Sequence, residues 1–527
     1  MTTRVLSTSP TGGPDAEYLR RIGYRQELHR RLGAFSSFAA GFSFVSILTT
    51  VFQLFALGYS FGGPAFFWTW PLVFAGQLCV ALVFAELASS WPLAGCIYQW
   101  SRRLAGETVG WFAGWAMLVG YVVSVAAIGI ALQAVLPAVW SGFQIVGDDP
   151  SITSASGAAN GILLGALLIA IVTVISAAGV RIMALIMGIG VTLEIIGVVL
   201  LLILLFGNAE RGPGVVTETL DVSGDSPYVF AFLASTLMAA YVMYGFDSAA
   251  ELSEETGEPR RVVPSAILRA LLVSFVGGGL MIVAALMAAP LLTDGQLSTG
   301  GIAYVITSQL DSSLGRMLLA VVAIAIVSAC LAIQNSASRV MFSMARDGRL
   351  PGARWLARVS PRTGTPILTG IAVSALAIGV LLVNLGNPAA FAAITSTSVV
   401  IVYLAYLLVT VPALADRVLG ARSSHQPRDP LAGSSHQRRD PLAGGFSLGR
   451  WGLPVNLFAV VYGAAMMVNI AWPRQAVYDP AGTSWVLQYL ALLFVAALVV
   501  VGLVVHRLLR RRSAPVAVPA VAAVAEG

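Results

Sequence analysis

The chain has 527 residues, of which 57% are hydrophobic and 11% are charged, and its net charge of +6 comes from arginine alone because it contains no lysine. A soluble protein carries about 25% charged residues and would divide at this length into several domains, so the composition excludes an ordinary soluble protein and indicates a polytopic membrane protein. The arginines lie in short loops rather than on one basic domain, which argues against a nucleic-acid partner.

Twelve apolar runs follow a polar N-terminal segment at 1–34. A membrane span needs about 20 apolar residues to cross about 30 Å of hydrocarbon, and such runs must be helices because lipid cannot satisfy free backbone groups. We therefore predict an all-α integral membrane protein of the lipid bilayer with twelve transmembrane helices. In chain order these spans lie near 35–57, 65–88, 110–137, 160–179, 182–206, 228–252, 264–290, 317–344, 366–385, 390–412, 453–471 and 484–506.

Arginine placement predicts the orientation of these spans. With a cytoplasmic N-terminus, almost every arginine falls in an inner loop or tail, and Arg211, Arg316 and Arg474 are the exceptions. Cytoplasmic loops of membrane proteins carry an excess of basic residues. We therefore predict a multi-pass protein of the plasma (inner) membrane with both termini in the cytoplasm.

Spans one and six contain similar interruptions. Span one reads "AAGFSFVSILTT" and span six reads "MYGFDSAAELSEE", so Gly-Phe and small polar residues interrupt both apolar runs, five spans apart. A lone glycine more often marks close helix packing, but interrupted helices at matching places in two halves point to the central site of a transporter. The residues at and beside the two interruptions are Gly41, Phe42, Ser43, Phe44, Val45, Ser46, Tyr244, Gly245, Phe246, Asp247 and Ser248.

Further motifs follow in order: "AELASSWPLAGCIYQWS" after span two, "GFDSAAELSEET" in span six, "NSASRVMFSMARDGRLP" after span eight and "PRTGTP" before span nine. With "GFSFVSIL" in span one, they resemble the amino acid–polyamine–organocation (APC) transporter superfamily. The chain is most similar to its bacterial amino acid/choline transporter family, which includes 4-aminobutyrate and choline permeases. The resemblance implies a 5+5 inverted-repeat, leucine-transporter-like fold with broken helices 1 and 6.

The domain organisation follows from the spans and the resemblance. We expect a transporter core at 35–412, with repeats near 35–206 and 228–412, and peripheral spans 11 and 12 at 453–506. The flexible cytoplasmic loop 413–452 between them contains "SSHQPRDPLAG" and then "SSHQRRDPLAG", a tandem 11-residue repeat. The tail at 507–527, rich in proline and small residues, is expected to be disordered.

The implied function is secondary transport of a small amino acid or related amine by alternating access, through proton symport or exchange. An amino acid, 4-aminobutyrate, choline and a polyamine all remain open as substrates. The alternatives are a sodium-coupled amine or choline symporter and a facilitative amine channel, although paired breaks favour a gated carrier. We expect no cofactor, no metal and no enzyme activity, because the four histidines lie at or beyond the ends of spans.

The resemblance also implies that the residues at and beside the two breaks, Gly41 to Ser46 and Tyr244 to Ser248, bind the substrate. Relatives bind a substrate carboxylate on free amides of the unwound span one, which here would be near Ser43, Phe44 and Val45. Phe246 matches the aromatic side chain that covers the substrate in relatives.

Two residues are candidates for ion coupling. Glu194 lies near the middle of span five, and acids inside a membrane are functional candidates, either as a proton carrier or as a neutral carboxyl bonded to a neighbouring helix. Ser328 lies near the middle of span eight, where sodium-using relatives place ion ligands, but it has no adjacent second hydroxyl. These observations favour a proton over sodium.

The acids after the second break suggest two purposes. Asp247 lies near the midplane, where it would either bind a substrate ammonium or cap the half-helix that follows, and the cap is the simpler interpretation because it needs no ligand. The remaining acids lie closer to the cytoplasm, where they would form a gate with basic residues after span eight or, alternatively, ordinary loop salt bridges. The predicted gate comprises Glu251, Glu254, Glu255, Arg339 and Arg346.

Overall fold

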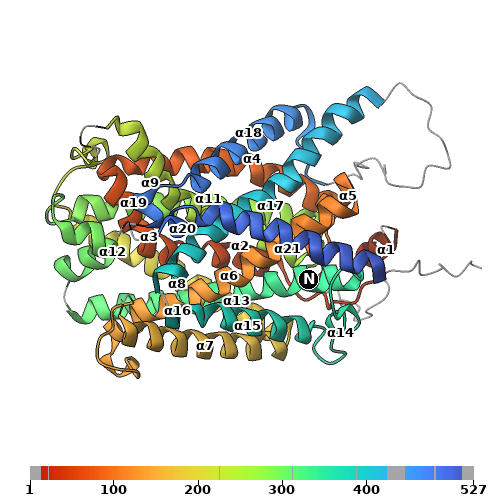
Figure 1. Ribbon diagram of the computed structural model, residues 1–527, viewed down its shortest axis with the longest axis horizontal. Helices are drawn as coiled ribbons and strands as arrows, with labels where there is room; N and C mark the ends of the chain where they lie inside the picture. Colours follow the sequence, from red (N-terminus) through yellow and green to blue (C-terminus); the bar gives the residue numbers. More distant parts are fainter. Residues whose placement is uncertain are drawn as a thin grey trace, which may run out of the picture.

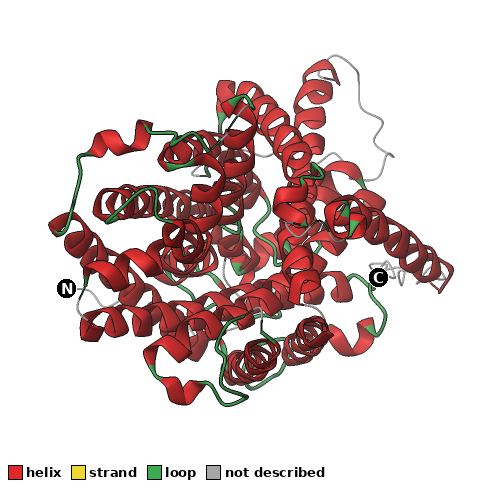
Figure 2. Cartoon of the chain, turned by 60° about the vertical axis from the view of Figure 1, so that its left-hand side comes forward, coloured by secondary structure: helices red, strands yellow, loops and turns green. Residues whose placement is uncertain are grey.

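The computed structural model describes residues 14–21, 23–152, 154–222, 224, 226–310, 312–386, 388–423, 445–479, 482 and 484–512. Within these ranges every regular element is a helix, and one isolated bridge joins Leu32 to Thr256. Figure 1 shows the long helices running side by side along the longest axis of the molecule, and Figure 2 shows the same bundle turned by 60°. The all-helical class predicted from the apolar runs is confirmed.

The first half of the chain contains five long helical stretches and shorter helices at their ends. Span one is divided into α2 and α3. The helix α5, which follows span two, was not predicted. In order, the elements are α1 (Pro14–Arg21), α2 (Ala34–Val45), α3 (Ile47–Gly62), η1 (Pro64–Trp68), α4 (Thr69–Ser90), α5 (Cys96–Ala105), α6 (Glu107–Val139), η2 (Ser141–Phe143), α7 (Ala155–Ala178) and α8 (Val180–Gly207).

In the second half of the chain, span six is divided into α9 and α10. The elements are η3 (Pro213–Thr217), α9 (Tyr228–Val242), α10 (Ser248–Glu251), η4 (Ser253–Glu255), α11 (Pro259–Ala288), α12 (Gly295–Gln309), α13 (Ser312–Arg346), α14 (Ala353–Leu356), α15 (Ile367–Leu381), α16 (Val383–Gly386), α17 (Pro388–Ser423), η5 (Gly449–Trp451), α18 (Gly452–Ala471), α19 (Gln475–Tyr478), α20 (Trp485–Gln488) and α21 (Leu490–Arg512).

Eleven helical stretches of the described residues are long and apolar enough to cross a membrane. The predicted span at 228–252 is not among them because its helix α9 has 15 residues and ends before the break. Twelve crossings and the inverted repeat therefore stay predictions. Helices α17 and α21 continue past their predicted ends, to Ser423 and Arg512. The rest of the tandem repeat, 424–444, and the tail after 512 lie outside the described residues.

The two ends of the bundle differ in the segments they carry. Figure 1 places α1, α5 and α14 at one end of the long axis and α12 and α19 at the other. The first group lies in the arginine-rich segments that the topology prediction assigns to the cytoplasm. This grouping of sequence-distant segments at one end agrees with the predicted alternation of loops.

The break in span one does not lie at the predicted place. Helix α2 continues through Gly41 to Val45, and the chain leaves the helix at Ser46, whose φ of 37° and ψ of 76° are left-handed. Gly41 is needed for packing instead, because a Cβ there would lie 3.0 Å from Ala270 Cβ and 3.3 Å from the Phe246 carbonyl oxygen. The break predicted at Gly41 was therefore wrong by five residues.

The break in span six lies where the sequence predicts it. Helix α9 ends at Val242 and α10 begins at Ser248, with Gly245 at a φ of 87° between them. L-residues with a side chain rarely adopt this φ. Glycine is therefore required at this position for conformational reasons.

Spans three and four pack through glycine. A Cβ on Gly165 of α7 would lie 3.0 Å from the Gly129 carbonyl carbon of α6, and a Cβ on Gly129 would lie 3.1 Å from Gly165 Cα. Small residues let helix backbones approach closely in membranes, where packing replaces the hydrophobic driving force. The two glycines thus fix the distance between these spans.

We predict that Gly165→Leu separates α6 from α7 and destabilises the protein by about 1–3 kcal/mol, the usual cost of overpacking. The matched control is Gly379→Leu in α15, an exposed position with no atom within 4 Å of the added Cβ. Unfolding midpoints in mixed detergent compare the two variants. Equal midpoints for both would contradict close packing at Gly165.

Candidate functional site

The two breaks lie against each other. A Cβ on Gly245 would overlap the ring of Phe44, which belongs to the last turn of α2. The Gly245 N–H donates to the Tyr406 hydroxyl at 3.0 Å, so the unwound backbone has a partner from α17. A further bond joins the segments, because Ser248 Oγ donates to the Ala40 carbonyl at 2.8 Å. The structure therefore brings the two predicted halves of the site together.

Asp247 lies beside this contact and is fully buried. Tyr121 of α6 donates to its Oδ2 at 2.9 Å, and Tyr406 donates to its Oδ1. Asp247 occupies the residue before α10, yet its side chain makes no capping hydrogen bond. The cap interpretation is therefore wrong, because two tyrosine hydroxyls take the carboxylate oxygens away from the helix end.

Aromatic rings surround the carboxylate. The Phe44 ring lies 5.4 Å from the Tyr121 ring and 5.8 Å from the Tyr244 ring. On the α17 side, Phe246 lies 5.8 Å from Tyr406. Aromatic faces attract cations, and a buried carboxylate adds a full negative charge. This arrangement suits an ammonium group.

The other predicted residues of span one are buried but have different partners. The Phe42 ring stacks on Phe38 at 5.6 Å, within the same helix. The Val45 carbonyl accepts from Thr50 Oγ1 at 3.0 Å, across the break. Ser43 Oγ is buried without a hydrogen-bond partner among the described residues. Phe42 thus packs within its own helix and Val45 bridges the break, whereas Phe44 reaches Tyr121 and Tyr244.

Glu194 holds the break in span one from α8. Its Oε1 accepts from Ser46 Oγ at 3.0 Å and from the Leu48 N–H at 3.2 Å. Its Oε2 is buried without a partner among the described residues. Ser328 lies one helical turn away, because a Cβ on Gly190 of α8 would overlap Ser328 Oγ. Both predicted coupling residues therefore lie where spans five and eight meet, and Glu194 bonds directly to the break.

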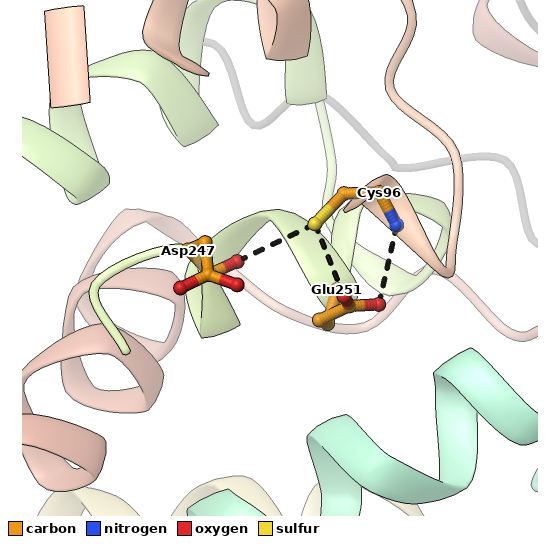
Figure 3. Close-up of side chains that lie close together, drawn as sticks. All are labelled: Cys96, Asp247 and Glu251. Atoms are coloured by element: carbon orange, nitrogen blue, oxygen red, sulfur yellow. Dashed lines mark hydrogen bonds between the residues drawn. The ribbon is translucent and has the colours of Figure 1, made fainter. Parts of the chain in front are cut away.

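Glu251 contacts the segment that follows span two. Cys96 Sγ lies 3.1 Å from Glu251 Oε1, and the Cys96 N–H donates to Glu251 Oε2 at 3.3 Å (Figure 3). Cys96 Sγ and carboxylate oxygens of Asp247 and Glu251 lie within 4.8 Å of one another. Bonds within this group and from the two tyrosines use part of the acceptor capacity of the two carboxylates. Among the described residues Glu251 forms no ion pair, so it does not join the predicted gate pairs.

The ion pairs predicted as a gate are present at η4, the short helix that follows α10. Arg346 donates to both oxygens of Glu254, at 2.9 and 2.8 Å, and the Ala94 N–H donates to Glu254 Oε1 at 3.0 Å. Arg339 donates to Glu255 Oε1 at 2.8 Å, with both side chains almost completely buried. These pairs join η4 to the C-terminal end of α13. Their role as a gate stays a prediction.

The N-terminal segment before α2 is tied to the same acids. The N–H groups of Arg31 and Leu32 donate to the Glu255 carbonyl at 2.8 and 2.9 Å, and Gln26 Nε2 donates to the Glu254 carbonyl at 2.9 Å. Sequence reasoning missed these contacts, because backbone pairing between irregular segments leaves no periodic signal. The segment is thus bonded to the same short stretch that holds the two ion pairs.

Asp347, at the end of the "MARD" motif, is contacted by several polar side chains. Arg102 donates to its Oδ2 at 2.6 Å, Tyr98 at 2.9 Å and Gln99 at 3.1 Å, while the Tyr24 hydroxyl lies 3.2 Å away. Burial raises the pKa of Tyr24, and the charge of Asp347 raises it further. A cavity of about 510 Å³ adjoins these residues. Asp347 therefore connects α5, the N-terminal segment and α13.

The sequence of the chain is similar to those of known proteins. The family model described as "Amino acid permease" matches residues 32–508. The chain is 28% identical to "Amino-acid permease BAT1" of Arabidopsis thaliana over 86% of this chain and 88% of the relative. It is 26% identical to "Amino-acid permease 2" of Neurospora crassa over 94% and 88%. It is 28% identical to the "Methylthioribose transporter" of Bacillus subtilis over 71% and 82%.

We predict that Glu255→Gln destabilises the protein by about 3–5 kcal/mol, because removing one partner leaves the Arg339 guanidinium buried and unpaired. Glu258→Gln, an exposed acid three residues on, is the control and should change stability little. Unfolding in mixed detergent measures both, and adding Arg339→Met to Glu255→Gln should recover part of the loss. A loss no larger than that of Glu258→Gln would refute a buried charge pair.

Proposed function

The chain belongs to the amino acid permease family, and from this premise we propose that it moves a small amino acid or related amine across the plasma membrane by alternating access. It is a transporter rather than an enzyme. The observation that carries the proposal is the buried carboxylate of Asp247 at the contact of two broken spans. Broken helices supply free backbone groups at a protein-lined site, and transporters use them to bind substrate.

We assign the substrate ammonium to Asp247. A carboxylate has about four lone-pair directions and two tyrosine hydroxyls use two of them, so acceptor capacity remains. An isolated charge in this apolar region is costly, and a cation of the substrate offsets that cost. The surrounding rings add cation–π attraction.

A substrate carboxylate would bind on the other side of the contact, at the break in span one. Helix α3 begins at Ile47, after the left-handed Ser46. The start of a helix carries free N–H groups and the positive end of the helix dipole. Leu48 N–H already donates to Glu194, and the N–H groups of Thr49 and Thr50 donate to the Ser46 carbonyl. The candidate amide is therefore that of Ile47 at the start of α3, rather than one near Ser43 within α2.

We further propose proton coupling through Glu194. Its carboxylate already bonds the Ser46 hydroxyl and the Leu48 N–H, while its second oxygen has no partner among the described residues. Adding or removing a proton there changes the charge at the N-terminus of α3 and hence the break itself. A sodium-coupled symporter and a channel are the alternatives that the experiment distinguishes.

Uptake into proteoliposomes tests the carrier and its coupling together. Labelled amino acids, 4-aminobutyrate, choline and polyamines are screened with an inward proton gradient and sodium replaced by potassium. We expect saturable uptake and counterflow that survive in potassium. In Glu194→Gln the gradient should no longer accelerate uptake, whereas Glu218→Gln, an exposed acid, should behave as wild type. Complete loss in potassium would refute proton coupling, and conductance without counterflow would refute a carrier.

The variant Asp247→Asn tests whether Asp247 binds the substrate ammonium or has only a structural role. The amide keeps the size of the side chain but loses its charge, so half-saturation for a substrate with an ammonium should rise at least tenfold, equivalent to about 1.4 kcal/mol. Tyr121→Phe, which removes one of two hydroxyl donors but leaves the charge of Asp247 in place, should have a smaller effect. The measurement is concentration-dependent uptake at equal amounts of folded protein. Near-normal half-saturation in Asp247→Asn would leave Asp247 only a structural role.

A further inference from the structure

A groove of about 290 Å³ lies where α11 begins, near the end of α4 and the segment before α18. Its lining shares no residue with the proposed substrate site or with the ion pairs of Glu254 and Glu255. Its lining combines two arginines with apolar side chains. The lining residues are Arg260, Arg261, Pro264, Ser265, Leu268, Gly445 and Phe446.

The two arginines form no ion pair with an acid among the described residues, and the first turn of α11 contains no acid. Arg260 is held in place, because its Nε donates to the Ser89 carbonyl at 3.0 Å and its guanidinium lies 4.7 Å from the centre of the Tyr18 ring. Arg261 is exposed. The described lining of the groove therefore carries two positive charges and no acidic side chain.

The length of α11 relates the groove to the bilayer that this helix would cross. Helix α11 has 30 residues, which correspond to a length of about 45 Å. That length covers the hydrocarbon layer and both headgroup regions of a bilayer. In such a bilayer the first turn of α11 would lie among the headgroups, and Leu268, two turns further, would lie beside the acyl chains.

We propose that an anionic phospholipid occupies this groove, with its phosphate between Arg260 and Arg261 and an acyl chain along Pro264, Leu268 and Phe446. Arginine matches phosphate through paired N–H donors. A soluble phosphate would offer the same charge but would leave the apolar wall uncovered, so a lipid is the occupant that fits both parts.

The position links the lipid to the cytoplasmic closure. Arg260 follows the paired acid Glu255 by five residues and bonds to Ser89, while Phe446 N–H donates to Ser89 Oγ at 2.9 Å. The segment of Phe446 is in turn fixed by Glu86, which bonds Arg417 and the Leu448 N–H. A bound lipid would thus hold α4, α11 and the segment before α18 together.

The test is the thermal stability of the purified full chain in nanodiscs of phosphatidylcholine, with or without 30% phosphatidylglycerol as an experimental choice. We expect phosphatidylglycerol to raise the midpoint of the wild type, since a ligand that binds the folded state stabilises it. In the Arg260→Gln/Arg261→Gln variant this rise should be lost. The charge-matched control is Arg354→Gln/Arg358→Gln, two exposed arginines near α14, which should keep it.

Two outcomes would overturn the proposal. One is an equal rise in wild type and in the Arg260→Gln/Arg261→Gln variant, which would mean general surface attraction. The other is an equal rise from soluble glycerol phosphate in pure phosphatidylcholine, which would mean a free-phosphate site. Neither measurement involves transport, so failure here is distinguishable from failure of the proposed function. Native mass spectrometry, which should retain phosphatidylglycerol on wild type and not on the variant, provides a second readout if the variant folds poorly.

Discussion

The cost of burying a carboxylate in an apolar interior determines how the centre of this protein is built. Four acids, Asp247, Glu251, Glu254 and Glu255, follow the second break, and all are fully buried. A buried charge is tolerated only where hydrogen bonds or a partner of opposite charge offset its lost hydration. Each acid has such donors, and those donors come from elements distant in sequence. The positions of α5, α6, α13 and α17 therefore depend on these four residues.

The kind of hydrogen-bond donor to these acids changes from the break toward the arginine-rich end of the bundle. At the level of the break, Asp247 has two tyrosine hydroxyls, and Glu251 has a thiol and a backbone N–H. Toward the arginine-rich end, Glu254 and Glu255 have guanidinium partners. Neutral donors do not cancel the charge of an ionised carboxylate, whereas the arginines neutralise the acids at the end. One short stretch thus supplies both the acid to which we assign the substrate ammonium and the acids of the buried ion pairs.

Part of this arrangement could be predicted from sequence and part could not. The break at Gly245 was predictable because a glycine interrupts an apolar run, and the ion pairs were predictable because complementary charges flank two spans. The break at Ser46 was missed because its left-handed serine is stabilised by Glu194, a residue 148 positions away. The donors of Asp247 were missed for the same reason, since Tyr121 and Tyr406 lie 126 and 159 positions away. Local sequence reports local backbone preference, whereas these partners are set by helix packing.

The contacts of the two breaks also define which parts must move together. Phe44 lies on Gly245, Ser248 bonds Ala40, and Gly41 packs on Ala270, so α2, the unwound part of span six and α11 form one connected group. Bonds to Asp247 from α6 and α17, and to Glu254 and Glu255 from α13, join this group to the rest. Under the alternating-access mechanism proposed above, opening the arginine-rich end would break bonds of the second kind while keeping the first. Asp247 accepts hydrogen bonds at this boundary, so a substrate bound to its carboxylate would act directly on the contact between the two groups.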